Sequence, residues 1–244
     1  MKRLFQVMWF SLRKVYEDLF LLWAMGGLWF LVTLGLPSGV YWLLDTFVRV
    51  PWLTVVGSIL SMAFSPPFSA AIHHVTFYLA REKRIEFSYF WQGLKIYFWP
   101  SYKITLPVFL SGAVLANALF FYLNNTQNTF FLIIGLIMIW MAFFWLGVQT
   151  YLFPLLMSQE DKSLKLILKN ASLLTLSFPF FVVGLLIVQL LFTALSIAIP
   201  ILLMLLLPFL ATSRNRALVV SLQQVKEIQE RQQEVQEEMD REDE

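Results

Sequence analysis

The sequence contains no cysteine, only two histidines and little charge. Without cysteine the chain can form no disulfide, no thiolate metal site and no thiol nucleophile. Charged residues make up 14% of the 244 positions, whereas soluble chains have about 25%. Hydrophobic residues reach 59%, and the mean hydropathy is +0.69. This composition excludes an ordinary soluble enzyme, a nucleic-acid-binding module and a disordered protein. It predicts an all-α, multi-pass membrane protein that contacts the lipid bilayer and no nucleic acid.

Long apolar runs divide the chain into expected membrane spans, each needing about 20 mainly apolar residues. The last run, 176–212, is too long for one span, and Pro200 can interrupt it because proline lacks an N–H donor. We therefore expect two spans there, with one broken helix as the alternative, and a cytoplasmic acidic helical tail over 213–244. The membrane domain, 1–212, has six expected spans, at 19–36, 51–79, 105–123, 130–157, 176–194 and 196–212.

The positions of the basic residues support six spans over five. With six spans, every one of the 18 basic residues except Arg49 falls on the same side of the membrane. Lysine and arginine collect in cytoplasmic loops. With five spans, the tail and its five basic residues would move to the other side. The sequence therefore predicts a cell-membrane protein with both termini in the cytoplasm.

Three cytoplasmic segments have the apolar periodicity of amphipathic helices that lie at the membrane interface. They cover about residues 5–19, 87–98 and 164–171, and each precedes a pair of spans. The apolar stripe of the first segment is Phe5, Met8, Leu12, Val15 and Leu19. This order, an interfacial helix followed by a hairpin of spans, indicates three parallel repeats. The alternative is that any six-span protein with three inner loops has this order by chance.

The tail after Arg214 has a weak heptad pattern. Its members follow one another at alternating three- and four-residue spacings: Leu218, Ser221, Val225, Ile228, Gln232, Val235 and Met239. The pattern is typical of a helix that pairs with a partner helix. A solitary exposed helix is the alternative interpretation.

No acidic or basic residue lies in the middle of any expected span. Intramembrane charges usually mark ion or proton pathways, so a proton-coupled carrier, a voltage sensor and a carboxylate sodium site are disfavoured. The chain also lacks a glycine-rich phosphate loop and the His-Glu-x-x-His pattern of zinc proteases. We therefore predict that the protein is not an enzyme, and we assign it no catalytic residue, no cofactor and no metal.

Polar residues within or beside the apolar runs are the candidate functional positions. His73 and His74 are neighbours whose side chains point about 100° apart on a helix, so one metal cannot readily bind both; the simpler interpretation is polar residues at a helix end. Asn117 and Gln189 have similar expected depths, which predicts a hydrogen bond between them. Gln149 lies at about the depth of His73. Interhelical hydrogen bonding and a substrate path are the two interpretations of these amides.

Three lysines on the third interfacial segment are candidates for docking a cytoplasmic partner. Lys162, Lys165 and Lys169 lie on its polar face. A helix that simply rests its apolar face on lipid is the alternative.

Three short stretches resemble segments of the bacterial YesL-like membrane proteins. The first is Ser65-Pro66-Pro67-Phe68-Ser69-Ala70-Ala71-Ile72, followed by Phe77-Tyr78. The second is Phe90-Trp91-Gln92-Gly93-Leu94-Lys95, and the third is Tyr151-Leu152-Phe153-Pro154-Leu155-Leu156 with Ser163-Leu164-Lys165 and Leu168-Lys169-Asn170-Ala171. The resemblance covers about residues 10–210. Ser65, Pro67 and Leu94 depart from the family pattern.

The resemblance implies an uncharacterised integral membrane protein connected with carbohydrate transport. YesL-like proteins are often encoded beside sugar-binding-protein-dependent ABC transporters. The function expected from this is an accessory or transport-related component of carbohydrate uptake, with ABC transporter subunits as partners. The alternative is a structural or assembly protein that binds a partner through its C-terminal helix. The resemblance implies no catalytic residues.

Overall fold

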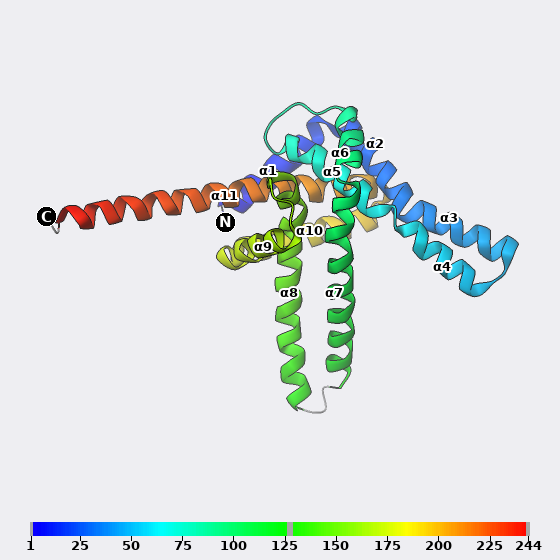
Figure 1. Cartoon of the computed structure of the whole chain (residues 1–244). Coiled ribbons are helices and arrows are strands. Elements are labelled where there is room, and N and C mark those ends of the chain that lie inside the picture. Colours follow the sequence, from blue (N-terminus) through cyan, green and yellow to red (C-terminus); the bar gives the residue numbers. More distant parts are fainter. Residues whose placement is uncertain (1, 126–128, 243–244) are drawn as a thin grey trace.

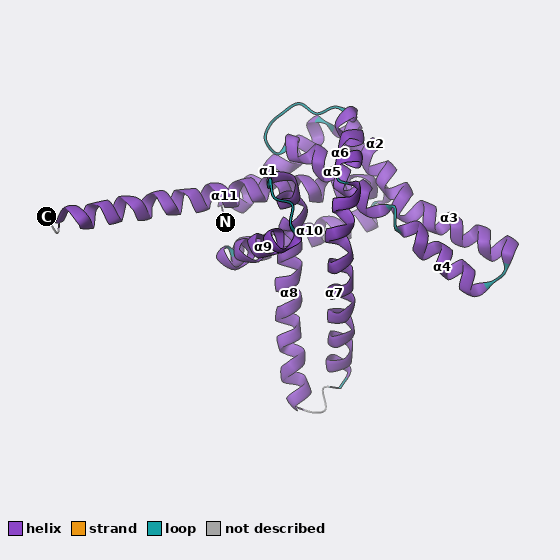
Figure 2. Ribbon diagram, in the orientation of Figure 1, coloured by secondary structure: helices purple, strands orange, loops and turns teal. Residues whose placement is uncertain are grey.

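The computed structural model describes residues 2–125 and 129–242, which form helices joined by short turns, with no strand in either range (Figure 2). The helices before the loop at residues 80–86 are α1 (Lys2–Glu17), α2 (Leu19–Phe30), α3 (Leu36–Leu43), α4 (Pro51–Met62) and α5 (Ser65–Leu79). The helices after it are α6 (Phe87–Ile96), α7 (Phe98–Asn124), α8 (Thr129–Ser158), α9 (Leu164–Ser177), α10 (Pro179–Ala198) and α11 (Leu203–Glu242). The predicted all-α fold is confirmed.

Within these residues, six helical segments are long and apolar enough to cross a membrane. They are Leu19–Val48, Pro51–Leu79, Phe98–Asn124, Thr129–Ser158, Pro179–Ala198 and Pro200–Glu237. The multi-pass expectation is therefore confirmed. The run 176–212 forms two helices, because the chain turns at Ile199 and passes through a 3₁₀ turn, Pro200–Leu202. The fifth span begins at Pro179 rather than at 176, since α9 continues to Ser177 and proline suits the first position of the next helix.

Proline also shapes the first two spans. Pro37 has no N–H for the helix, and the π turn Leu31–Gly35 directly before it carries the helix from α2 into α3. In the second span, α4 ends at Met62, and α5 begins with Pro66 and Pro67 in its first turn. The second span is therefore two helices joined at residues 63–64.

Three hairpins share a common base: α3 with α4, α7 with α8, and α10 with the start of α11. The first two project from this base in different directions, to the right and downward (Figure 1). A short helix precedes each hairpin: α1, α6 and α9 in turn. The expected order of a short helix followed by a hairpin thus occurs three times in the described residues.

The base forms around α11, which packs against α1, α2, α5, α8 and α10. Its core has two parts. The first contains Leu22, Met25, Ile72, Phe90 and Phe209. The second contains Tyr151, Leu152, Leu155, Ile167 and Leu218. Much of α7 remains exposed, as expected for a helix whose apolar surface meets lipid.

The tail expected from residue 213 onward is continuous with the last span. Helix α11 runs without a break from Leu203 to Glu242, and Ser213, Asn215, Leu218 and Ser221 are each at most 1% exposed. Beyond Glu227, which pairs with Arg3 of α1, the helix leaves the body and extends alone (Figure 1). The heptad pattern therefore has a packed first half and a projecting second half, with the Met239 side chain outside the described atoms.

Candidate functional site

The second membrane span of each hairpin carries proline close to the base. Pro66 and Pro67 begin α5, Pro154 lies in α8, and Pro208 lies in α11. These three helices contact one another in the centre of the molecule. The polar residues of the candidate site lie just beyond the prolines, where the three helices meet.

His73 of α5 contacts both of the other helices. Its ring stacks on Phe153 of α8, with the ring centroids 4.8 Å apart. Its backbone oxygen accepts a hydrogen bond of 3.1 Å from the Asn215 amide of α11, which also donates to Thr76 Oγ1 at 2.9 Å. His73 and Asn215 are each 1% exposed. His73 therefore links α5 to α8 through its ring and to α11 through its backbone oxygen.

His74 lies on the other side of α5, against α6. A β-carbon added to Gly93 would lie 2.7 Å from the His74 β-carbon, so only glycine permits this approach. The His74 ring meets Tyr78 edge-on at 5.1 Å and lies 5.4 Å from the ring of Tyr97. Burial raises the pKa of the Tyr97 phenol, because the phenolate would lose its hydration.

The three stretches that carry the YesL-like resemblance meet at these two histidines. His73 directly follows the first stretch, Ser65–Ile72, and stacks on Phe153 of the third. His74 contacts Gly93 of the second stretch. The simpler interpretation of the pair, as polar residues at a helix end, did not predict these contacts between helices. The position of His73 directly after the first stretch was the sequence feature that could have indicated them.

Gln189 forms a second buried polar contact, between α10 and α11. Its side-chain oxygen accepts two hydrogen bonds of 3.2 Å from the Arg214 guanidinium, and its Nε2 donates to Ser213 Oγ at 3.4 Å. Arg214 is partly buried and forms no ion pair within the part of the chain that the structure describes. Sequence reasoning placed Arg214 and Asn215 in an exposed tail and missed both, because only the packing of α11 brings them into the base.

The predicted hydrogen bond between Asn117 and Gln189 is not formed. Asn117 is exposed on α7 and donates to the carbonyl of Ala113 on its own helix at 2.7 Å. Gln149 is partly buried on α8, one turn before Phe153, and its Nε2 has no hydrogen-bond partner. Equal expected depth along the spans therefore did not predict which side chains form hydrogen bonds. The hairpins diverge, so residues at the same depth on different hairpins can lie far apart.

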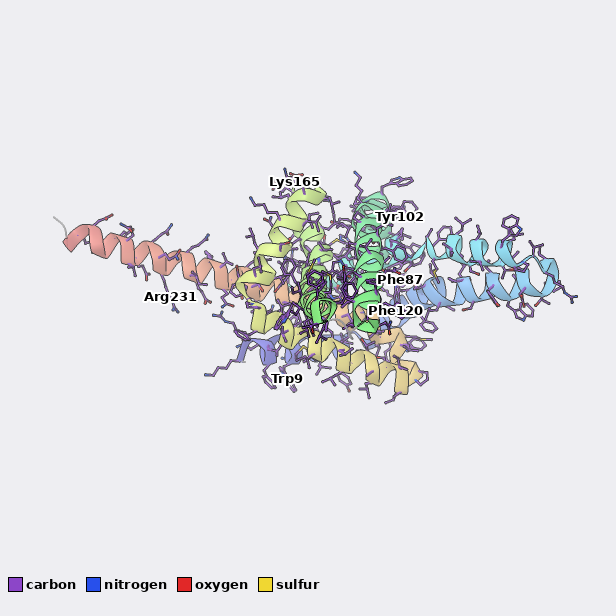
Figure 3. The ribbon with its side chains drawn as sticks, turned by 90° about the horizontal axis from the view of Figure 1, so that it is seen from below. Trp9, Phe87, Tyr102, Phe120, Lys165 and Arg231 are labelled. Atoms are coloured by element: carbon purple, nitrogen blue, oxygen red, sulfur yellow. The ribbon has the colours of Figure 1, made fainter. Side chains whose placement is uncertain are left out.

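The three candidate lysines have different environments. Lys162 precedes α9, and its ammonium group lies 4.6 Å from the centre of the Tyr97 ring, close enough for a cation–π contact. Lys165 and Lys169 are exposed one turn apart on α9, and Lys165 points away from the body (Figure 3). Of these three lysines, Lys165 and Lys169 have exposed ammonium groups that form no ion pair among the described residues.

The side chains of the site hold helices together through packing and hydrogen bonds. Within the described residues, no three His, Cys, Asp or Glu side chains come close enough to hold a metal ion. A hydroxyl pair, Tyr151 and Ser221, links α8 to α11 at 3.0 Å. His73 Nδ1, His74 Nε2 and Asn215 Oδ1 are buried without a hydrogen-bond partner. The residues can therefore orient the hairpins through stacking, close packing and hydrogen bonds.

Comparisons with known proteins add no further assignment. The chain matches no family model, no curated protein and no solved structure.

Proposed function

We propose that the protein is a non-catalytic membrane accessory protein that binds a partner protein on the projecting half of α11. One observation carries the proposal. Ile228 and Val235, seven residues apart on this helix, are 44% and 55% exposed. The earlier members of the same heptad pattern, Leu218 and Ser221, are 1% exposed within the base. The apolar seam thus continues beyond the body, and no helix of the described residues covers it.

Charge indicates which kind of helix fits this seam. Residues 222–242 contain three basic and seven acidic side chains, a net charge of −4. A second copy of the same helix would bring like charges together, which is unfavourable. A partner helix with an apolar stripe and basic flanks would satisfy both the seam and the charge. We therefore propose a basic amphipathic helix of another protein as the occupant.

The resemblance supports a more specific identity for this partner. YesL-like proteins are associated with carbohydrate uptake, so a subunit of an ABC transporter is the proposed partner. The exposed Lys165 and Lys169 on α9 offer an additional contact surface on the base. In this proposal the protein assists the transporter and performs no chemistry itself.

Substitution of Ile228 tests the proposal directly. Ile228→Glu places a carboxylate in the seam and should reduce the partner crosslinked to the full-length protein in native membranes by at least about tenfold, as for other buried interface anchors. Gln233→Glu is the matched control, because it adds the same charge at an exposed position outside the seam. Quantitative mass spectrometry of the crosslinked products measures the effect. Equal capture by the two variants would contradict the proposal.

We further propose that the protein lies in the cell membrane and that both of its termini are in the cytoplasm. Reporter fusions at Asn125, beside the α7–α8 loop, should report the outer side, and fusions at Lys165 should report the cytoplasm. The physical reason is the concentration of lysine and arginine at the base of the hairpins. A fusion at Asn125 that reports the cytoplasm would overturn this orientation.

A further inference from the structure

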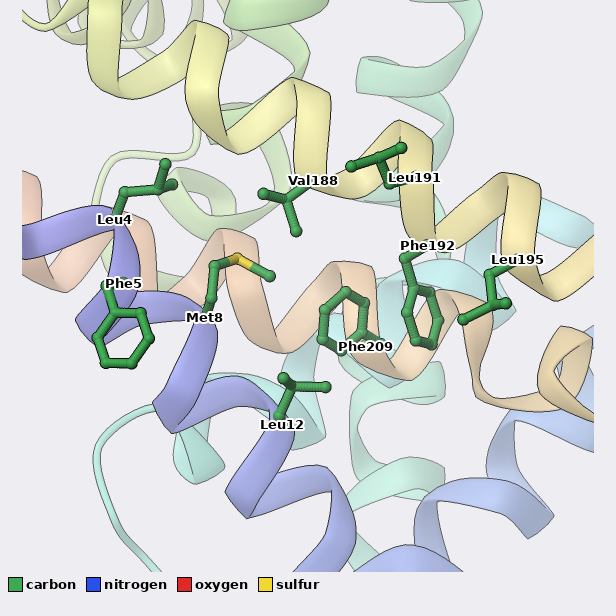
Figure 4. A pocket seen from close by; sticks show the side chains of 9 residues that line it. All are labelled: Leu4, Phe5, Met8, Leu12, Val188, Leu191, Phe192, Leu195 and Phe209. Carbon is green, nitrogen blue, oxygen red and sulfur yellow. The ribbon is translucent and has the colours of Figure 1, made fainter. Parts of the chain in front are cut away.

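An apolar groove runs between α1 and α10, above the surface of α11 (Figure 4). Its volume is about 550 Å³, and every residue that lines it is apolar. Met8 and Leu12 form the α1 side, Val188 and Leu195 form the α10 side, and Phe209 lies at the floor. The sequence pattern of α1 did not predict this groove.

The groove exists because the packed face of α1 overlaps only in part with the apolar stripe that its periodicity predicts. Its buried residues are Val7, Met8, Ser11 and Val15. Phe5 and Leu12, both members of the expected stripe, are 69% and 50% exposed, and they line the groove. The apolar surface of α1 is therefore wider than its contact with the rest of the protein, and part of it is exposed in the groove.

A second cavity of about 560 Å³, lined by both apolar and polar residues, adjoins the groove at Leu4, which lines both. Lys2, Arg3, Ser177 and Gln224 supply its polar side chains. Arg3 is paired with Glu227 at 2.8 Å, whereas Lys2 forms no ion pair among the described residues. This end of the groove therefore carries a net positive charge.

We infer that the groove and the adjoining cavity bind one anionic phospholipid. The acyl chain would lie along α10 toward Leu195, and the phosphate would meet the Lys2 ammonium group. From Gly184, where Leu4 crosses α10, to Leu195 the helix rises about 16 Å at 1.5 Å per residue. This length is about half of a hydrocarbon core of roughly 30 Å, which corresponds to one leaflet. Basic pockets between helices are the known environment for anionic headgroups.

Native mass spectrometry of the full-length protein tests this site. The detergent-solubilised protein is given equimolar phosphatidylglycerol and phosphatidylcholine, and the fraction that retains each lipid is measured. Phosphatidylglycerol should be retained preferentially. Lys2→Ala should lower its retention about fivefold, the effect expected for one basic residue near an anionic lipid.

Two further variants separate the headgroup from the acyl chain. Val188→Trp fills the groove and should reduce retention of both lipids, whereas Lys2→Ala affects only the anionic one. Lys165→Ala is the matched control, because Lys165 is also an exposed lysine but lies on α9, outside both cavities. Thermal unfolding confirms that each variant is folded. Equal retention of the two lipids by the wild-type protein, or equal losses in Lys2→Ala and Lys165→Ala, would overturn the inference.

Discussion

Replacing Gly26 by alanine should destabilise the protein by about 3 kcal/mol or more, the upper end of the usual effect of overpacking. Gly26 lies in α2 where this helix crosses the start of α11. A β-carbon at this position would overlap the backbone oxygen of Met204, and it would also lie 3.0 Å from Pro208 Cγ. Backbone atoms cannot rotate away as a flexible side chain can, so the two helices would have to separate.

The close approach at Gly26 has a physical cause in α11. In an α-helix the carbonyl of Met204 would accept a hydrogen bond from the residue four positions later. That residue is Pro208, which has no N–H. The Met204 oxygen instead faces Gly26, where the absence of a side chain lets the backbones approach. Small residues serve the same purpose at helix crossings in membrane proteins generally.

The adjacent glycine supplies the control. A β-carbon on Gly27 would meet only the Met204 sulfur at 3.6 Å, an ordinary contact with a flexible side chain. Gly27→Ala should therefore leave the midpoint of thermal unfolding in detergent nearly unchanged, while Gly26→Ala lowers it clearly. If the two variants unfold at the same temperature, the described crossing of α2 and α11 is wrong.

Replacing Gly93 by alanine should have the second-largest effect, a destabilisation of about 1–3 kcal/mol. The added β-carbon would lie 2.7 Å from His74 Cβ, 2.9 Å from Cδ2 and 3.0 Å from Cγ. Because the nearest of these atoms is attached to the α5 backbone, α6 would have to shift away from α5. Such a shift would also loosen the packing of Tyr97 against the His74 ring.

A double substitution distinguishes this contact from a general loss of helix stability. His74→Ala removes the two ring atoms but keeps the β-carbon, so it should recover part of the stability lost in Gly93→Ala. Gly39→Ala is the control for helix propensity, since nothing lies within 4 Å of the position where its β-carbon would be. Thermal unfolding of the single and double variants in detergent measures the coupling. Additive effects of the two substitutions would contradict the described contact.

The overall class of the protein followed from local properties of the chain. Apolar length predicts a membrane span, and Pro200 predicts the interruption between the last two spans, because both depend on residues close together in the sequence. The three short helices before the hairpins were likewise predictable from their periodicity. Their packed faces were not, as Val7 and Ser11 in α1 illustrate.

The site itself depends on contacts between residues far apart in the chain. His73 and Asn215 are 142 positions apart, and Arg3 and Glu227 are 224 apart. No periodicity within a segment specifies which helices become neighbours, and the apolar surfaces that face lipid resemble those that face protein. For this reason the expected pairing of Asn117 with Gln189 was wrong, although both residues were correctly placed on helices.

The scarcity of cysteine and charge and the abundance of apolar residues determined by themselves that this is a helical membrane protein with six expected spans. Only the tertiary structure decided that α11 runs unbroken from the membrane domain into the projecting helix, and that His73 and His74 occupy the junction of the three hairpins. The reason is physical. Hydrophobicity and proline act on each segment alone, whereas close packing at glycine and interhelical hydrogen bonds require two segments to be brought together.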